Sequence, residues 1–175
     1  MRLKWPGFNA KGNVLIDLEA ELFCLAEIPV LVQGEHFSPK DELHVTLIGE
    51  KVGLILQNEI RRDPETNKVL ERVFEGIDWS FEKTGPVHIL SRSNKGTLQK
   101  SIIMLLNMPG MTALYEQLKS LGLIPYKTPL PPPHVTLYTH NCPLGIGVPS
   151  DEVLNTLSIE TMSLSALNLL CEQGS

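Results

Sequence analysis

Cysteine is scarce in this chain, and its three residues, Cys24, Cys142 and Cys171, form no Cys-x-x-Cys pair. An odd count without such a pair argues against a disulfide framework and against a structural zinc site. We therefore expect reduced thiols in an intracellular protein. The sequence also lacks the run of roughly 20 apolar residues that a membrane-spanning helix needs, and it begins without the apolar segment of a signal peptide. These absences predict a cytoplasmic protein without a membrane partner.

The chain also has no excess of basic residues. It carries 15 Lys and Arg against 20 Asp and Glu, which gives a formal net charge of -5. Proteins that bind long nucleic acids through their phosphates usually present a basic surface, so a long duplex is not an expected partner. A small nucleotide or the end of an oligonucleotide is compatible with this balance. Hydrophobic residues make up 42% of 175 residues, enough for one compact domain with a core.

Short apolar runs alternate with amphipathic stretches, which predicts a mixed α+β fold. The segment 22–25 fits a strand or a helix. Gly34, 38–40 and 91–96 are predicted to be loops because they are polar or contain glycine or proline. The expected strands are 14–18, 28–32, 43–48, 79–82, 87–90, 102–106, 134–138 and 159–164. The expected helices are 51–60, 64–76, 112–122 and one that begins after Ser150.

One tetrapeptide, His-Val-Thr-Leu, occurs twice, at His44 and at His134. Each copy lies in a predicted strand and is followed by a predicted helix and a further strand, so the two halves share one order of elements. No Gly/Ser linker separates them. We therefore predict a single domain, residues 1–175, made of two lobes of approximately 1–90 and 91–175.

The repeated motif places an imidazole and a hydroxyl on the same side of each strand, because residues i and i+2 share a face. His44 and Thr46 would then face His134 and Thr136 across a common cleft. Two histidines can serve as base and acid in displacement at phosphorus, because their unperturbed pKa lies near neutrality. The threonine hydroxyls can hold the non-bridging oxygens. This chemistry requires no metal and no other cofactor.

The two His-x-Thr motifs resemble those of the 2H phosphoesterase superfamily, which includes RNA 2′,3′-cyclic phosphodiesterases and the proteins called 2′-5′ RNA ligases. The resemblance implies a two-lobed, pseudo-symmetric α+β fold with antiparallel sheets, outer helices and a central cleft. It implies a metal-independent phosphodiesterase acting on a 2′,3′-cyclic or 2′-5′-linked nucleotide or RNA end, with His44, Thr46, His134 and Thr136 as catalytic residues. Tyr138 and Thr139 follow the second motif, where many bacterial members have a basic residue.

Three further residues are candidates for substrate binding. Tyr138 and Tyr126 are aromatic and suited to stacking on a base, and Lys127 is suited to a phosphate. For each of the three, an ordinary surface position is an equal alternative. Arg92, with the neighbouring lysines of its predicted turn, is another basic group that can attract phosphate.

The remaining histidines have simpler interpretations. His88 lies between apolar residues and is expected to be an ordinary core or surface residue, whereas His36 is expected in a solvated loop. His140 is expected in a surface loop, with a position lining the cleft as the alternative. A zinc site would need three or four of these side chains to converge, which the motif spacing does not favour. Two further alternatives stay open: a non-catalytic nucleotide- or RNA-binding module of the same fold, and a 2′-5′ RNA ligase. The protein is expected to be a monomer.

Overall fold

The computed structural model describes residues 1–23, 25 and 28–167. Its strands are β1 (Val14–Leu18), β2 (Val30–Val32), β3 (Glu35–Pro39), β4 (Leu43–Ile48), β5 (Glu82–Asn94), β6 (Thr97–Asn107), β7 (His134–His140) and β8 (Ser158–Ser163). Its helices are the 3-10 helix η1 (Ala20–Phe23), α1 (Glu50–Arg62), α2 (Glu65–Gly76), α3 (Pro109–Ser120) and α4 (Asp151–Leu157). Cys24 and Cys171 lie outside the described residues, whereas Cys142 is a buried free thiol.

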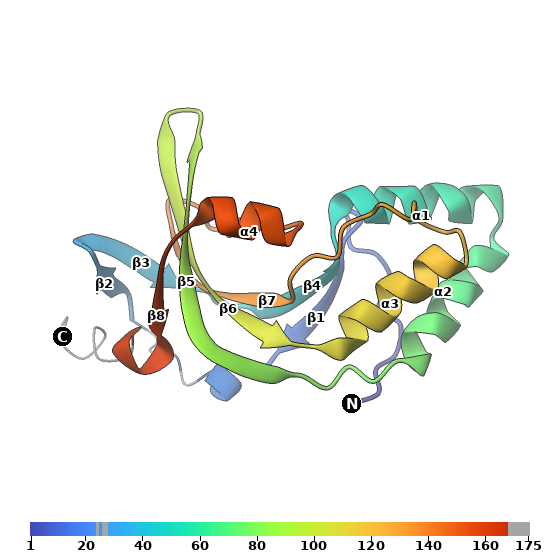
Figure 1. The fold of residues 1–175 in the computed structure, drawn as a ribbon, viewed down its shortest axis with the longest axis horizontal. Coiled ribbons are helices and arrows are strands. Elements are labelled where there is room, and N and C mark those ends of the chain that lie inside the picture. Colours follow the sequence, from blue (N-terminus) through green and yellow to red (C-terminus); the bar gives the residue numbers. More distant parts are fainter. Residues whose placement is uncertain (24, 26–27, 168–175) are drawn as a thin grey trace.

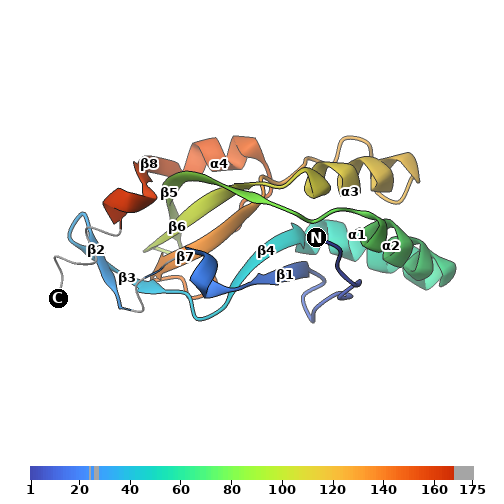
Figure 2. The same cartoon turned by 90° about the horizontal axis from the view of Figure 1, so that it is seen from below.

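The strands form one antiparallel eight-stranded sheet, which confirms the predicted α+β class. The order along the sheet is β1-β4-β7-β6-β5-β8, and β3 pairs with β7 and with β2 (Figure 1, Figure 2). The predicted boundary near residue 90 falls inside β5, which continues to Asn94. The main core draws residues from both halves of the sequence.

Several predicted elements differ from those observed. The segment 38–40 is predicted to be a loop, but Ser38 and Pro39 belong to β3, because their pairing with β7 outweighs their turn-forming composition. The predicted turn at 91–96 is shorter, since β5 and β6 continue on both sides of Lys95 and Gly96. The expected strand at 79–82 is absent: Trp79 is fully buried before β5 begins, and its indole N–H donates to the Phe74 carbonyl over 3.0 Å.

The main core covers one face of the sheet and extends between the helices α1, α2 and α3. Its strand residues alternate along the chain, as in Val45 and Leu47 of β4 or Ile102 and Met104 of β6. Helix α1 packs closely on the segment before β1: a Cβ on Gly53 would lie 1.7 Å from the Gly12 carbonyl oxygen. Only glycine fits at this contact.

A second, smaller cluster covers the opposite face of the sheet, which we call the α4 face. It consists of Leu90, Ile103, Cys142, Ile146, Val148 and Leu154. Helix α4 begins where Ser150 accepts a hydrogen bond from the Val153 N–H, as the sequence predicted. Figure 1 shows α4 lying over the strands β5 and β6, whereas α1 lies beyond the end of β4, beside α2 and α3.

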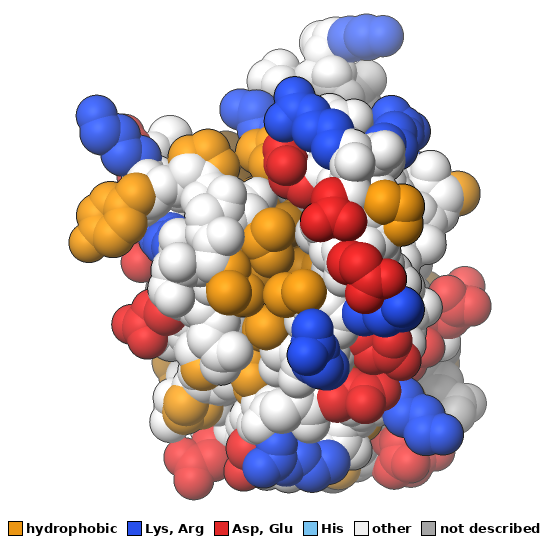
Figure 3. All heavy atoms as spheres, turned by 90° about the vertical axis from the view of Figure 1, so that its right-hand side faces the viewer, with side chains coloured by type: hydrophobic (Ala, Val, Ile, Leu, Met, Phe, Trp, Pro, Cys, Tyr) orange, Lys and Arg blue, Asp and Glu red, His pale blue; other side chains and the backbone are white. Residues whose placement is uncertain are grey.

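The helical end of the molecule carries hydrophobic side chains in its middle and charged ones around them (Figure 3). A shallow groove lies there between α2 and α3, lined by Val69, Arg72, Val73, Gln117, Ser120 and Leu121. These residues belong to the helices and not to the strands that carry the repeated motif.

Candidate functional site

The two His-Val-Thr-Leu segments lie on adjacent antiparallel strands, β4 and β7, with Val45 paired to Val135. One step to either side, His44 is opposite Thr136 and Thr46 is opposite His134. Both valines are fully buried in the main core, so the two histidines and two threonines share the α4 face, where all four are half-buried. Directly opposite residues of such a pair have Cβ atoms about 4.5–5.5 Å apart, and diagonal ones about 7–8 Å. The structure therefore brings together all four residues that the sequence predicted, and we call them the His-Thr quartet.

His134 is held by the main chain that leads into β7. Its ring Nδ1 lies 2.8 Å from the Pro132 carbonyl oxygen. A carbonyl only accepts, so Nδ1 carries the hydrogen and the neutral ring keeps Nε2 as its free acceptor. Burial lowers the pKa of His134, the Pro132 hydrogen bond raises it, and the nearby His44 lowers it further, with a net shift below the usual 6.5. The charge effect between the rings is consistent with their diagonal placement.

His44 has a more mixed charge environment. Burial and then Lys40 lower its pKa below 6.5, while the carboxylates of Asp17 and Glu42 act in the opposite direction. Asp17 is directly opposite His44 in the β1–β4 pair, so its side chain lies on the same face. The sequence analysis did not single out Asp17 or Lys40, because only the strand pairing brings them near the imidazole.

A loop that follows β7 packs against the quartet. Ile146 anchors this loop by donating its main-chain N–H to Ser101 Oγ over 3.0 Å. Gly145 adopts a φ of +81°, and a Cβ at this position would lie 3.1 Å from Thr136 Oγ1 and 3.2 Å from its Cγ2. The Cys142 thiol donates to the Gly145 carbonyl over 3.0 Å. The loop backbone therefore forms one wall of the space around Thr136.

The three predicted substrate-binding residues are not part of this group. Tyr138 is fully buried in the main core, because a β-bulge beside it turns its side chain away from the face of His134. The burial of Tyr138 contradicts both its predicted role in stacking on a base and the alternative of an ordinary surface position. Tyr126 is 87% exposed, with the Lys119 ammonium 5.9 Å from its ring centroid, and Lys127 is exposed. Neither has a hydrogen bond or ion pair to the quartet within the described part of the chain.

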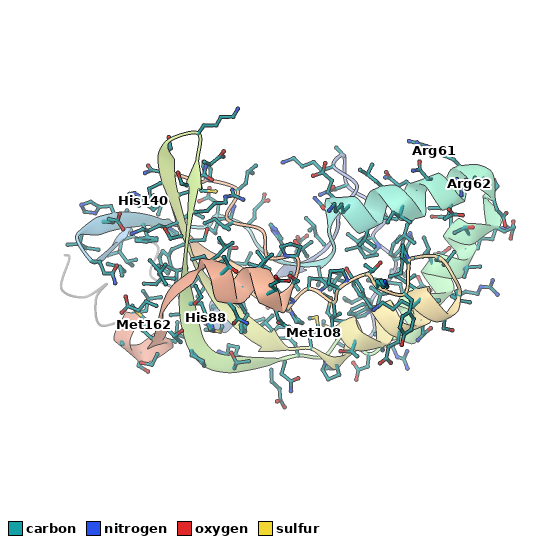
Figure 4. The ribbon with its side chains drawn as sticks, turned by 45° about the horizontal axis from the view of Figure 1, so that its top comes forward. Arg61, Arg62, His88, Met108, His140 and Met162 are labelled. Atoms are coloured by element: carbon teal, nitrogen blue, oxygen red, sulfur yellow. The ribbon has the colours of Figure 1, made fainter. Side chains whose placement is uncertain are left out.

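The other histidines have separate surroundings (Figure 4). His88 is half-buried, and its Nδ1 lies 3.2 Å from Ser158 Oγ at the end of α4 and 3.3 Å from Thr161 Oγ1. Burial lowers the pKa of His88. His140 Nδ1 lies 2.8 Å from the His36 carbonyl oxygen, which ties the end of β7 to β3. These contacts are structural.

Over residues 1–23, 25 and 28–167, no three His, Cys, Asp or Glu side chains gather in a way that could hold a metal ion. In the same ranges, no helix has the length and apolar character to cross a membrane.

Comparison with protein-family models, with curated proteins and with solved structures found no match to this chain. Its function is therefore inferred from the repeated motif and from the geometry of the quartet.

Proposed function

We propose that this protein is a metal-independent phosphodiesterase acting on a 2′,3′-cyclic or 2′-5′-linked nucleotide or RNA end, with His44 and His134 as its acid and base. The observation that carries the proposal is the pairing of Val45 with Val135. It gives two imidazoles and two hydroxyls on one face, the set of groups that displacement at phosphorus needs.

The surroundings of each ring support one assignment of the acid and base roles. His134 has its Nδ1 hydrogen committed to Pro132 and a lowered pKa, which leaves a neutral Nε2 to accept a proton from water. His44 has the carboxylates of Asp17 and Glu42 nearby, which favour its protonated form even though its net pKa is lowered. His44 is therefore assigned as the acid.

Hydrolysis of a 2′,3′-cyclic phosphate then proceeds with a balanced transfer of one proton at each end. His134 takes a proton from water as the water oxygen bonds to phosphorus. The bond from phosphorus to one ribose oxygen breaks, and His44 donates a proton to that oxygen. Thr46 and Thr136 donate hydrogen bonds to the non-bridging oxygens as charge develops on them. The product is a ribose phosphomonoester with one free hydroxyl.

The proposal includes a pseudo-symmetric, two-lobed arrangement around the quartet. Each motif strand has its own outer neighbour, β1 beside β4 and β6 beside β7. Each is followed in the chain by a helix, α1 after β4 and α4 after β7 (Figure 1). This correspondence supports a twofold relation between β4 and β7.

The test is turnover of a panel of 2′,3′-cyclic mononucleotides and 2′-5′-linked dinucleotides in EDTA. We expect hydrolysis that follows a bell-shaped pH dependence and is lost in His44→Asn and in His134→Asn. Asparagine keeps an N–H at about the position of Nδ1, so the contact of residue 134 with Pro132 can persist. Binding of the panel without product would instead indicate a nucleotide-binding module. Joining of cyclic-phosphate ends would indicate a ligase.

A further inference from the structure

A pocket of about 290 Å³ lies beside the quartet, where β3, β7 and the loop after β7 meet. It is lined by Ser38, Pro39, Lys40, Asp41, Thr139, Asn141, Cys142 and Pro143. Ser38 is paired with Thr139, and Thr139 with Ser101 on its other side. Ser101 bonds to the loop on the α4 face, so the pocket opens on the same face as the quartet.

Lys40 connects the pocket to the quartet. Its ammonium group donates to the Pro143 carbonyl over 2.9 Å, and its main-chain N–H donates to the Leu137 carbonyl over 2.9 Å. Lys40 is also close enough to His44 to affect the charge of that ring. Along β7, Thr136 and Thr139 are three residues apart, which is roughly 10 Å of extended strand. A ligand group in the pocket is therefore within about that distance of a phosphorus atom held by the quartet.

The pocket contains groups suited to a nucleotide. The Lys40 ammonium provides positive charge, the hydroxyls of Ser38 and Thr139 are donors and acceptors, and Pro39 and Pro143 offer apolar surface. A stacked strand of nucleic acid advances about 3.4 Å per nucleotide. The separation of roughly 10 Å thus corresponds to about two or three nucleotides.

The hairpin formed by β5 and β6 lies beyond the pocket and carries positively charged residues. Residues 91–100 include Arg92, Lys95 and Lys100 and no Asp or Glu. Lys100 is paired with Glu35, but Arg92 and Lys95 are exposed. The Asn141 side chain donates to the Leu98 carbonyl over 3.2 Å, which joins the pocket wall to this hairpin. Figure 1 shows the hairpin projecting from the sheet beside α4.

We propose that the pocket and the hairpin form a track for the single-stranded segment that precedes the reacting phosphate. The preferred substrate is then an oligonucleotide end and not a free mononucleotide. This inference rests on the proposed phosphodiesterase function and adds the substrate length. Arg92 is placed to contact a backbone phosphate beyond the pocket: it lies on the α4 face, where its guanidinium donates to Gln99 Oε1 over 2.9 Å.

The test compares cyclic-phosphate-ended substrates of one, two, three and five nucleotides. We expect kcat/KM to rise at least tenfold from one to three nucleotides and to change little beyond about five. The rise should weaken with added salt, because phosphate contacts are salt-dependent. Equal kcat/KM for all lengths would overturn the track while leaving the phosphodiesterase function intact.

Ser38→Phe fills the pocket from an exposed strand position. We expect this variant to lose the length dependence while its kcat/KM for the mononucleotide stays within about twofold. His36→Phe is the matched control, because residue 36 is exposed on the same strand and does not line the pocket. An unchanged length dependence in Ser38→Phe would contradict the proposal.

A second variant tests the hairpin away from the pocket. The double change Arg92→Gln with Lys95→Gly removes two exposed charges, and glycine suits the φ of 49° at position 95. It should lower kcat/KM for the five-nucleotide substrate and leave the mononucleotide rate unaltered. If no substrate is turned over, the same length series is titrated with 3′-phosphorylated oligonucleotides. Binding that rises with length and is lost in Ser38→Phe supports the track, and length-independent binding refutes it.

Discussion

Gly145→Ala is predicted to impair turnover through Thr136, although residue 145 has no reactive group. The new Cβ would lie 3.1 Å from Thr136 Oγ1 and 3.2 Å from Cγ2. Both distances are shorter than ordinary van der Waals contacts, so the threonine must move by a few tenths of an ångström. The backbone φ of +81° adds a conformational cost of about 1–2 kcal/mol for a residue with a Cβ.

The expected loss of kcat is about tenfold on a cyclic mononucleotide. Removing a hydrogen-bond donor to the transition state entirely costs roughly 10²–10³ in kcat, and a displaced Thr136 should lose only part of that. The control is Gly34→Ala, since Gly34 has a similar φ of +78° and no atom within 4 Å of the added Cβ. Both variants should lose about 1–2 kcal/mol in free energy of unfolding, measured in urea, but only Gly145→Ala should lose kcat.

A double variant tests whether the effect acts through the Thr136 side chain. Gly145→Ala combined with Thr136→Ser removes the methyl group that meets the new Cβ and keeps the hydroxyl. We expect kcat to recover relative to Gly145→Ala alone. The reasoning is refuted if kcat falls by the same factor in Gly145→Ala and Gly34→Ala. It is also refuted if the loss of kcat in the double variant is the product of the losses in its two single variants.

Three further predictions concern stability. Burial places the pKa of His134 below 6.5. As the pH falls from about 7 to about 5, the unfolded chain therefore binds more protons than the folded protein. The free energy of unfolding should decrease over this range. His134→Asn should make urea-derived stability depend less on pH in this window, and an unchanged slope would contradict the shift. Ser101→Ala leaves the Ile146 N–H without its partner and should cost about 1–3 kcal/mol, whereas Ser101→Thr retains a hydroxyl and should cost less in the same urea titration. Ser150→Ala removes the cap of α4 and should cost about 1 kcal/mol, with Ser150→Asp restoring most of it; equal losses in both variants would show that the cap does not contribute.

The strands of the quartet were predictable because both alternate apolar with polar residues and contain β-branched ones, which local sequence encodes. The face shared by His134 and Thr136 followed from the same alternation. The sequence predicts that the two motifs meet, but not that β4 and β7 pair as neighbouring strands, because this pairing joins residues far apart in sequence. Asp17 illustrates this: only the β1–β4 register places it opposite His44.

For Tyr138, the alternation of side chains along a strand predicts the wrong face of the sheet. Strict alternation places it on the face of His134 and Thr136. However, the β6–β7 register advances by two residues on β7, from Thr136 to Tyr138, against one on β6, from Ile103 to Ile102. The extra residue turns Tyr138 into the main core. A bulge of this kind depends on the neighbouring strand and leaves no clear signal in the segment itself.

Strand β3 was missed for a related reason. Ser38 and Pro39 are typical of loops, and this segment is stabilised as a strand by backbone pairing to β2 and β7. Proline is tolerated because it is the last residue of the strand. The pocket beside the quartet could therefore not be predicted from the sequence, because β3 forms one of its walls.

The central claim is that two imidazoles from distant parts of the chain act on one phosphorus atom. A crystal structure of the protein with a slowly hydrolysed 2′,3′-cyclic phosphorothioate nucleotide tests it most directly. We predict a phosphorus atom between the rings, with an oxygen or sulfur ligand within hydrogen-bond distance of Nε2 of both His44 and His134. A nucleotide whose phosphate contacts neither ring, or only one of them, would contradict the account.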